Sequence, residues 1–309
     1  MPSQRPAELV MGSVQIGLDY GAANRTGKPS REAALRLVRR AAESGVKTFD
    51  TARAYGDSEE RLGEALAVTK PVRTITKLSP LADLTDRPSW HAVCAAVDSS
   101  IEQSRFALQR ERLDCVLLHR ASHMTAYDGA VWTRLLELRR NGTITSLGVS
   151  VQSASEALTA LASQDVDHIQ LPFNILDWRW KDAGVIAAIR QRGDVTVHAR
   201  SVFLQGILAS NDASTWPKIP GVNGKELLAV ISDCADEFGR ESAADLCLAY
   251  ARGQDWIDGT VIGMETEAQL DANLRLSIKP PLSREDCAWI EKMIPRVPER
   301  LLDPAQWPK

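Results

Sequence analysis

Four side chains could act together as a proton-delivery group: Asp50, Tyr55, Lys77 and His119. Three successive apolar runs, typical of buried strands, end at or just before them. A phenol is a weak acid near neutral pH, and a nearby ammonium favours its ionised form. Lys77 would thus help Tyr55 act as a general acid or base, while Asp50 held Lys77 in place. His119 would steer a substrate oxygen or relay a proton.

Each of these residues has an ordinary structural explanation when it is taken alone. A tyrosine is often a half-buried loop aromatic, a lysine at a strand end is often solvated, and a histidine can be a satisfied core residue. Their succession at the ends of the second, third and fourth predicted strands favours a catalytic group instead.

The elements that must position these residues follow from the hydrophobic pattern. Short β-branched runs alternate with longer segments whose apolar residues recur at helical spacing. Asp57, followed by Glu60, predicts a capping box at the start of one helix. The predicted strands are 9–13, 48–50, 72–77, 114–119, 144–150, 168–171, 195–200 and 260–263. The predicted helices are 31–44, 58–68, 89–108, 126–141, 154–163, 181–192, 225–238, 242–252 and 267–276.

This alternation predicts an α/β protein, a (β/α)8 TIM barrel that forms a single domain over residues 1–309. An open doubly wound sheet is the alternative, but it normally has the glycine pattern G-x-G-x-x-G after its first strand. Gly12 and Gly17 do not fit that spacing, so the barrel is favoured. The carboxyl ends of barrel strands converge on one mouth, which would bring the four residues together.

Charge and composition exclude several classes of partner. The chain carries 37 Lys and Arg against 40 Asp and Glu, a net charge of −3 without blocks of one sign, which argues against nucleic acid and anionic membranes. No apolar stretch approaches the ~20 residues of a membrane span, and the N-terminus lacks a signal-like apolar segment. The five cysteines and five histidines lack metal-ligand spacing. We therefore expect a cytoplasmic protein without a metal, acting on a small molecule; its oligomeric state is not indicated.

The stretch 45–56, Gly-Val-Lys-Thr-Phe-Asp-Thr-Ala-Arg-Ala-Tyr-Gly, resembles the signature of the aldo-keto reductase superfamily. Lys77 and His119 match the remaining members of that family's catalytic tetrad, and the resemblance runs from about residue 10 to residue 273. It implies a (β/α)8 barrel that binds NADPH or NADH without a Rossmann domain. It also implies hydride transfer between nicotinamide C4 and a carbonyl carbon, with Tyr55 donating the proton to the oxygen.

The resemblance also implies contacts with the nicotinamide and the pyrophosphate. Ser150 and Gln170 match residues that hold the carboxamide, although Val151 stands where the family usually has an asparagine. Arg200 stands where many relatives stack a tyrosine on the nicotinamide, and a guanidinium plane can stack too. The residues that match the pyrophosphate loop are Ser201, Leu204, Gln205 and Gly206.

Segment 261–273 resembles the family's adenosine-binding segment, with Gly263, Glu265, Gln269 and Asn273 at the matching positions. Glu265 stands where NADP-preferring relatives often carry Arg or Lys. A carboxylate repels a 2′-phosphate and can accept hydrogen bonds from a free ribose diol. We therefore expect NADH to compete with NADPH or to be preferred, although the nearby helix N-terminus is an alternative phosphate site.

The aromatic candidates for the substrate pocket are Tyr20, Trp178 and Trp180. Tryptophans beside polar groups suit either a sugar or an aryl ring. Asp19 and Asn24, close to Tyr20, favour a polyhydroxylated or sugar-like carbonyl compound.

Two other functions are compatible with the fold. A nicotinamide-binding regulatory subunit would bind the cofactor with little turnover. A non-redox barrel enzyme, such as an isomerase or an aldolase, would bind no nicotinamide. The complete tetrad favours a reductase over both.

Overall fold

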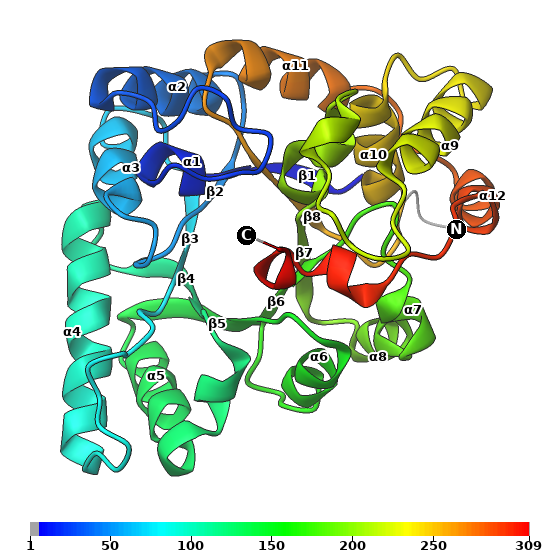
Figure 1. The fold of residues 1–309 in the computed structure, drawn as a ribbon. Helices are drawn as coiled ribbons and strands as arrows, with labels where there is room; N and C mark the ends of the chain where they lie inside the picture. The colour runs from blue at the N-terminus through cyan, green and yellow to red at the C-terminus, as the bar shows by residue number, and fades with distance from the viewer. Residues whose placement is uncertain (1–5, 309) are drawn as a thin grey trace.

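Eight parallel strands close into a barrel in the computed structural model, which describes residues 6–308. Each strand pairs with its neighbour in sequence, and β8 closes the barrel against β1. Figure 1 shows the strands at the centre of a ring of helices. The strands are β1 (Glu8–Gly12), β2 (Thr48–Asp50), β3 (Arg73–Lys77), β4 (Leu113–Leu118), β5 (Ile144–Ser150), β6 (His168–Pro172), β7 (Thr196–Arg200) and β8 (Gly259–Gly263). The predicted (β/α)8 barrel is confirmed.

The helices cover the outside of the barrel with their apolar faces turned inward. Across residues 6–308, no helix combines the length and apolar character needed to cross a bilayer. The α-helices are α1 (Val14–Gly17), α2 (Arg31–Glu43), α3 (Ser58–Leu66), α4 (Trp90–Leu108), α5 (Ala130–Arg140), α6 (Ala154–Leu161), α7 (Arg179–Asp182), α8 (Val185–Arg192), α9 (Gly224–Glu237), α10 (Ala243–Arg252), α11 (Glu267–Ser277) and α12 (Arg284–Met293). The 3₁₀ helices are η1 (Ala121–Met124), η2 (Ala126–Gly129), η3 (Leu204–Ala209), η4 (Ala213–Thr215), η5 (Glu299–Leu302) and η6 (Pro304–Gln306).

The helices differ from the predicted ones where the backbone departs from helical angles. The helix predicted over 126–141 begins only at Ala130, because Tyr127 and Asp128 have φ angles of 54° and 53°. The helix predicted over 181–192 is divided into α7 and α8. Apolar spacing continues across both interruptions, so periodicity alone could not reveal them.

Asp57 precedes α3 but makes no side-chain hydrogen bond to the helix amides, so the predicted capping box is wrong. Its carboxylate instead forms ion pairs with Lys28 at 2.7 Å and Arg61 at 3.0 Å. Both carboxylate oxygens of Asp57 are thus paired with cations and do not accept hydrogen bonds from the amides at the start of α3. Asp57 therefore joins the loop before α2 to α3.

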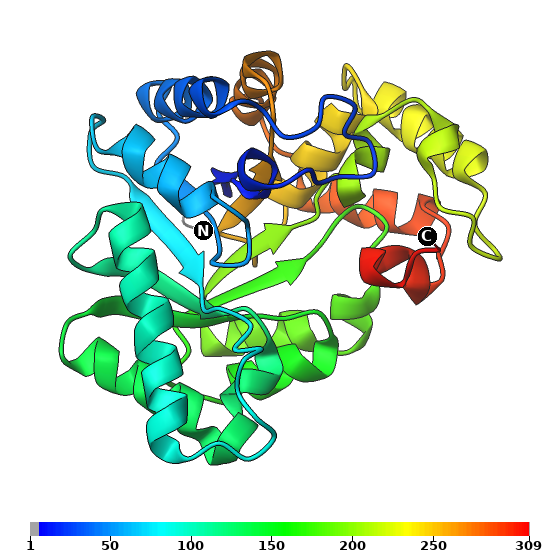
Figure 2. The same cartoon turned by 60° about the vertical axis from the view of Figure 1, so that its left-hand side comes forward.

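The carboxyl ends of the strands open on one face of the barrel. In Figure 2 the C-terminal segment, drawn in red, lies ahead of the arrowheads of the green strands. That segment is held there by η5, whose Leu301 and Leu302 are buried. The long loop after β7 and the loop after β1 border the same mouth.

Two histidines occupy the interior of the barrel below this mouth. Because side chains alternate along a strand, His168 shares a face of β6 with Gln170, and His198 shares a face of β7 with Arg200. Gln170 and Arg200 line the cavity at the mouth, so the histidines point into the barrel beneath them. The two imidazole centroids are 4.3 Å apart, and a Cβ at Gly259 would lie 2.8 Å from the His198 ring. A glycine at that position leaves room for the ring.

The interior histidines are uncharged in the folded protein. Burial, helped by Arg73 and Lys77, lowers the pKa of His198 to about 3. Burial and then His198 hold the pKa of His168 well below its usual range. Neither ring nitrogen of His168 has a hydrogen-bond partner among the described residues. An imidazolium at His168 would lack a compensating acceptor among these residues, whereas Glu8 Oε1 lies 3.9 Å from His198 Nε2.

These pKa shifts predict a stability that falls in acid. At pH values between the ordinary histidine pKa near 6.5 and the lowered values, these histidines are protonated in the unfolded chain but remain neutral in the folded protein. The free energy of unfolding should then fall with decreasing pH by up to about 1.4 kcal/mol per pH unit for each histidine. Urea denaturation at pH 7 and pH 5 measures this loss. His198→Asn should reduce it, with the exposed His91→Asn as matched control; an unchanged loss in His198→Asn would contradict the assignment.

Candidate active site

A buried ion pair at the ends of β2 and β3 forms the base of the site. The Lys77 ammonium donates to Asp50 Oδ1 at 2.8 Å, to Asp50 Oδ2 at 2.7 Å and to the Thr51 carbonyl at 2.9 Å. Lys77 is 1% exposed and Asp50 is 3% exposed. Burial alone would lower the pKa of Lys77, but Asp50 and the Tyr55 phenol outweigh it and raise that pKa. The lysine is therefore a fixed cation.

Tyr55 lies beside this cation on the loop between β2 and α3. The Lys77 Nζ atom is 5.1 Å from the centroid of the Tyr55 ring. The backbone of this loop packs directly on α1, and a Cβ at Gly17 would lie 1.9 Å from the Tyr55 carbonyl oxygen. Only a glycine fits there, so Gly17 lets the loop approach the barrel closely enough to place the phenol.

His119 completes the group from the other side of Tyr55. It follows directly after β4, and its ring meets the Tyr55 ring edge-on, with centroids 5.7 Å apart. Burial, then the charges of Lys77 and Arg200, lower the pKa of His119 to about 4. The imidazole is thus neutral at physiological pH and retains one N–H that can donate a hydrogen bond. The structure brings together all four residues that the sequence singled out.

A cavity of about 1140 Å³ opens above this group. Asp50, Tyr55 and His119 line it, whereas Lys77 lies beneath them. Its length reaches from the loops after β4 and β5 to α11. Every expected cofactor residue lines it as well: Ser150, Gln170, Arg200, Ser201, Leu204, Gln205, Gly206, Gly263, Glu265, Gln269 and Asn273.

Gln170 connects the cavity wall to the ion pair. Its Nε2 donates to Asp50 Oδ1 at 2.7 Å, while its Oε1 is buried without a hydrogen-bond partner among the described residues. Buried polar atoms are normally satisfied, so a free acceptor at this place suits a ligand with an N–H donor. The carboxamide of a nicotinamide offers such a donor.

Arg200 extends from the end of β7 into the cavity, and no carboxylate within residues 6–308 forms an ion pair with it. Its Nη2 donates to Gln152 Oε1 at 2.7 Å and to the Val151 carbonyl at 3.2 Å. Burial lowers the pKa of Arg200, although Tyr55 opposes the shift. Gln152 is not among the residues expected from the sequence. The family usually has an asparagine at position 151, and the side-chain amide of Gln152, one residue later, was the feature of the sequence that could have indicated this contact.

The loop after β7 is strained and pinned to the loop after β1. Ser201, Leu204 and Gln205 have φ angles of 61°, 43° and 59°, which non-glycine residues rarely adopt. Gln205 accepts a hydrogen bond from the Ala23 amide at 3.2 Å and donates one to the Tyr20 hydroxyl at 2.8 Å. Tyr20 lines the cavity, as expected. Strain of this kind is typical of ligand-binding loops.

At the far end of the cavity, Glu265 lies just before α11. The Gln269 side chain folds back over the start of this helix, where its Oε1 accepts from the amides of Glu265 at 2.7 Å and Thr266 at 3.3 Å. Thr266 in turn caps the Gln269 amide. Among the described residues that line the cavity between positions 261 and 276, none is Lys or Arg.

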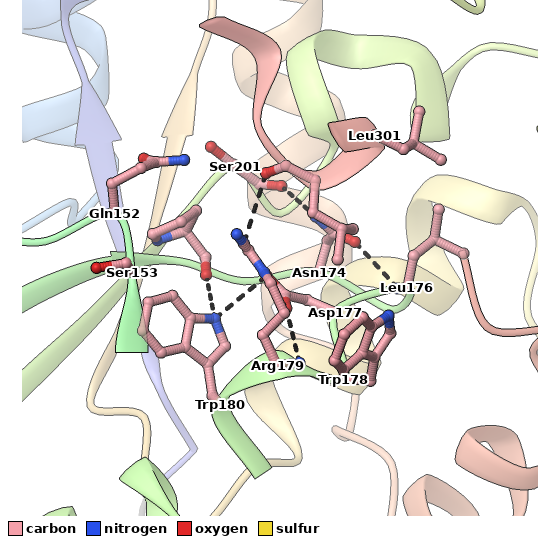
Figure 3. A network of polar contacts seen from close by, with 12 residues as sticks. Gln152, Ser153, Asn174, Leu176, Asp177, Trp178, Arg179, Trp180, Ser201 and Leu301 are labelled. Carbon is pink, nitrogen blue, oxygen red and sulfur yellow. Dashed lines mark hydrogen bonds and ion pairs between the residues drawn. The ribbon is translucent and has the colours of Figure 1, made fainter. Parts of the chain in front are cut away.

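The two tryptophans expected in the substrate pocket lie elsewhere. Trp180 is 1% exposed, and its indole donates to the Pro172 carbonyl at 2.7 Å. The Trp178 indole donates to the Val297 carbonyl at 3.0 Å, and the Arg296 guanidinium stacks 3.7 Å from its ring. Neither lines the cavity: Trp178 lies in the loop after β6, directly before α7, and Trp180 lies within α7 (Figure 3). The structure thus corrects their expected placement, since they pack the wall and the C-terminal segment.

An ion pair stabilises this loop. Asp177 accepts from Arg179 Nε at 2.9 Å and from Arg179 Nη2 at 2.7 Å, as Figure 3 shows. In the same network, Asn174 donates to the Ser201 carbonyl at 3.4 Å. The loop after β6 is therefore tied to the start of the loop after β7. Within residues 6–308, no group of three or more His, Cys, Asp or Glu side chains could hold a metal ion.

Comparison with known proteins gives one consistent result. Aldo-keto reductase str7 of Strobilurus tenacellus is 27% identical over 271 residues, which cover 81% of this chain and 77% of that protein. The structure resembles aldo-keto reductase AKR11C1 from Bacillus halodurans (holo form), with a TM-score of 0.75, 21% identity and 96% of each chain covered.

It also resembles the glycerol dehydrogenase AKR11B4 from Gluconobacter oxydans, with a TM-score of 0.73, 20% identity, and 93% and 91% of the two chains covered. At these identities the solved structures share the fold. The Aldo/keto reductase family model matches residues 8–295. The chain belongs to the aldo/keto reductase family, whose members carry out nicotinamide-dependent oxidation and reduction of carbonyl compounds and alcohols.

Proposed function

We propose that this protein interconverts a carbonyl compound and its alcohol, with Tyr55 as the general acid and base. The observation that carries the proposal is the buried Lys77–Asp50 pair beside the Tyr55 ring at the wall of the cavity. A fixed cation there stabilises negative charge on the phenolic oxygen while its proton moves. The bound cofactor supplies or accepts the hydride.

The chain's own residues supply the proton and orient the substrate. In reduction, the Tyr55 O–H bond breaks and the proton passes to the substrate oxygen; in oxidation, the proton returns. His119, neutral because its pKa is about 4, can donate a hydrogen bond to the same oxygen without carrying a charge. Asp50 keeps Lys77 in place through two hydrogen bonds.

The cavity wall suits a nicotinamide cofactor. The unsatisfied Oε1 of Gln170 can accept from a carboxamide, and Ser150 lies on the neighbouring strand. Arg200, held by Gln152, presents a guanidinium plane to the ring. The residues of the loop after β7, Ser201 and 204–206, would hold the pyrophosphate.

Glu265 favours NADH over NADPH in this arrangement. No Lys or Arg between residues 261 and 276 lines the cavity, so in this segment a 2′-phosphate would meet a carboxylate without a cation to offset it. Side chains already occupy part of the amide set at the start of α11: Gln269 Oε1 accepts from the Glu265 and Thr266 amides, and the Thr266 hydroxyl accepts from the Gln269 amide. A ribose diol could instead donate hydrogen bonds to Glu265.

Replacing Tyr55 by phenylalanine tests the proton-transfer role. The variant keeps the ring but loses the proton, so kcat for aldehyde reduction should fall by about 10²- to 10⁴-fold with little change in NADH affinity. Steady-state kinetics and fluorescence titration measure the two quantities. Tyr127→Phe, in η2, is the matched control. Turnover at the wild-type rate in Tyr55→Phe would contradict the role of Tyr55 as the proton donor. Cofactor binding with negligible turnover in the wild type would favour a regulatory protein.

Reversing the charge at position 265 tests the cofactor preference. Glu265→Arg removes a repulsion and adds a phosphate partner, so NADPH affinity should rise by about tenfold, equivalent to about 1.4 kcal/mol. NADH affinity should fall or stay level. Glu285→Arg makes the same charge change at the start of α12, outside the cavity. If wild-type protein already bound NADPH far more tightly than NADH, the preference would be wrong and the fold assignment would stand.

A further inference from the structure

The end of the cavity beside His119, where the substrate would lie, contains two arginines, Arg120 and Arg200. With the two tryptophans placed elsewhere, its walls come from the loops after β4 and β5, which contribute Arg120, Ser122 and Gln152. Arg120 follows His119 directly in the chain. It is exposed to the cavity mouth, and its positive charge acts on both His119 and His123.

Arg120 has no counterion in the described part of the chain. No hydrogen bond or ion pair joins its guanidinium to another described residue, whereas Arg25, which also lines the cavity, pairs with Asp212 at 3.5 Å. Arg179, in the neighbouring loop, pairs with Asp177. An arginine without a partner beside a reaction centre leaves its planar set of donors free for a ligand oxyanion.

The acidic groups nearby are already engaged. Asp50 is held by Lys77, and the Glu156 carboxylate accepts from the Gln152 amide at 2.6 Å and the Ser153 amide at 3.1 Å. Asp303, which acts on Arg200 electrostatically, accepts from Gln306 at 2.7 Å. None of these carboxylates bonds to Arg120, so the positive charge at this end is not cancelled by direct contact.

We propose that Arg120 binds an oxyanion of the substrate, a carboxylate or a phosphate, so that the preferred substrates are carbonyl compounds carrying such a group a few bonds from the carbonyl. The inference rests on the proposed function and adds its substrate class. Arg120 binds one end of the molecule while His119 and Tyr55 meet its carbonyl oxygen. A guanidinium can hold either oxyanion through paired hydrogen bonds.

Matched substrates test the inference and separate the two oxyanions. We would compare 4-oxobutanoate with butanal, and glyceraldehyde 3-phosphate with glyceraldehyde, in wild-type protein, Arg120→Met and Arg120→Lys. Arg120→Met should lower kcat/KM for an anionic substrate about 10- to 100-fold more than for its neutral counterpart, the size of a lost charge-assisted hydrogen bond. Arg120→Lys should restore part of the difference. Arg112→Met, an exposed arginine outside the cavity, is the control.

Two results would overturn the inference. One is that the wild-type protein shows no preference for either anionic substrate, and the other is that Arg120→Met lowers kcat/KM equally for the anionic and the neutral member of a pair. Binding gives a readout that does not need turnover. Calorimetric titration with 4-oxobutanoate should show weaker binding to Arg120→Met than to wild type. Arg120-dependent binding without turnover would support this site and contradict the proposed reductase activity. Turnover of both the neutral and the anionic aldehydes, without any effect of Arg120→Met on either, would contradict the site and support the reductase activity.

Discussion

The site depends on one buried ion pair. Removing two charges from water costs several kcal/mol for each ion, and a buried pair is often no more stabilising than apolar residues of similar shape. Lys77 and Asp50 are nonetheless both buried, and the Lys77 ammonium donates three hydrogen bonds, two to Asp50 and one to the Thr51 carbonyl. What the pair provides is position: an ammonium that cannot move away from the Tyr55 ring. Gln170, which also bonds to Asp50, joins the cofactor wall to the same point.

The charges around the pair divide the cavity into two ends with different chemistry. Around Asp50, Tyr55, Lys77 and His119, burial and then the positive charges of Lys77, Arg200 and Arg120 lower the pKa of His119 and keep it neutral. Beside α11, Glu265 contributes a carboxylate, and no Lys or Arg between residues 261 and 276 lines the cavity there. The first end favours anionic groups and developing negative charge, and the second disfavours them. Under the proposed assignments, one cavity would select both the cofactor and the substrate by charge.

The sequence was sufficient to predict the barrel and the convergence of the four strand-end residues on one mouth, because both follow from regular rules. Strand and helix periods alternate without ambiguity, and the four residues stand where strands must end, so the mouth was predictable. The tryptophans were not. Nothing in the sequence around Trp180 distinguishes an indole at a pocket from one that donates to the Pro172 carbonyl within the wall. Long-range partners decide that choice.

Other differences have the same origin. Asp57 fits a capping pattern locally, but Lys28 and Arg61 take its oxygens, and Lys28 is distant in sequence. Gln152 was missed because the match with the family pattern places the amide at position 151, whereas this chain presents one from position 152 to Arg200. Short-range patterns therefore located the elements and the strand-end chemistry, while the lining of the substrate end required the folded structure.

The most direct test of the central claim replaces the ion pair by a neutral pair. In the double variant Asp50→Asn, Lys77→Met, neither member of the pair is left as an unpaired buried charge, so thermal stability should be equal to or higher than that of the wild type. Single-turnover hydride transfer from NADH to 4-nitrobenzaldehyde, followed by stopped-flow absorbance, should nevertheless slow by about 10²-fold or more, because the phenol has lost its cation. A folded double variant that transferred hydride at the wild-type rate would contradict the account.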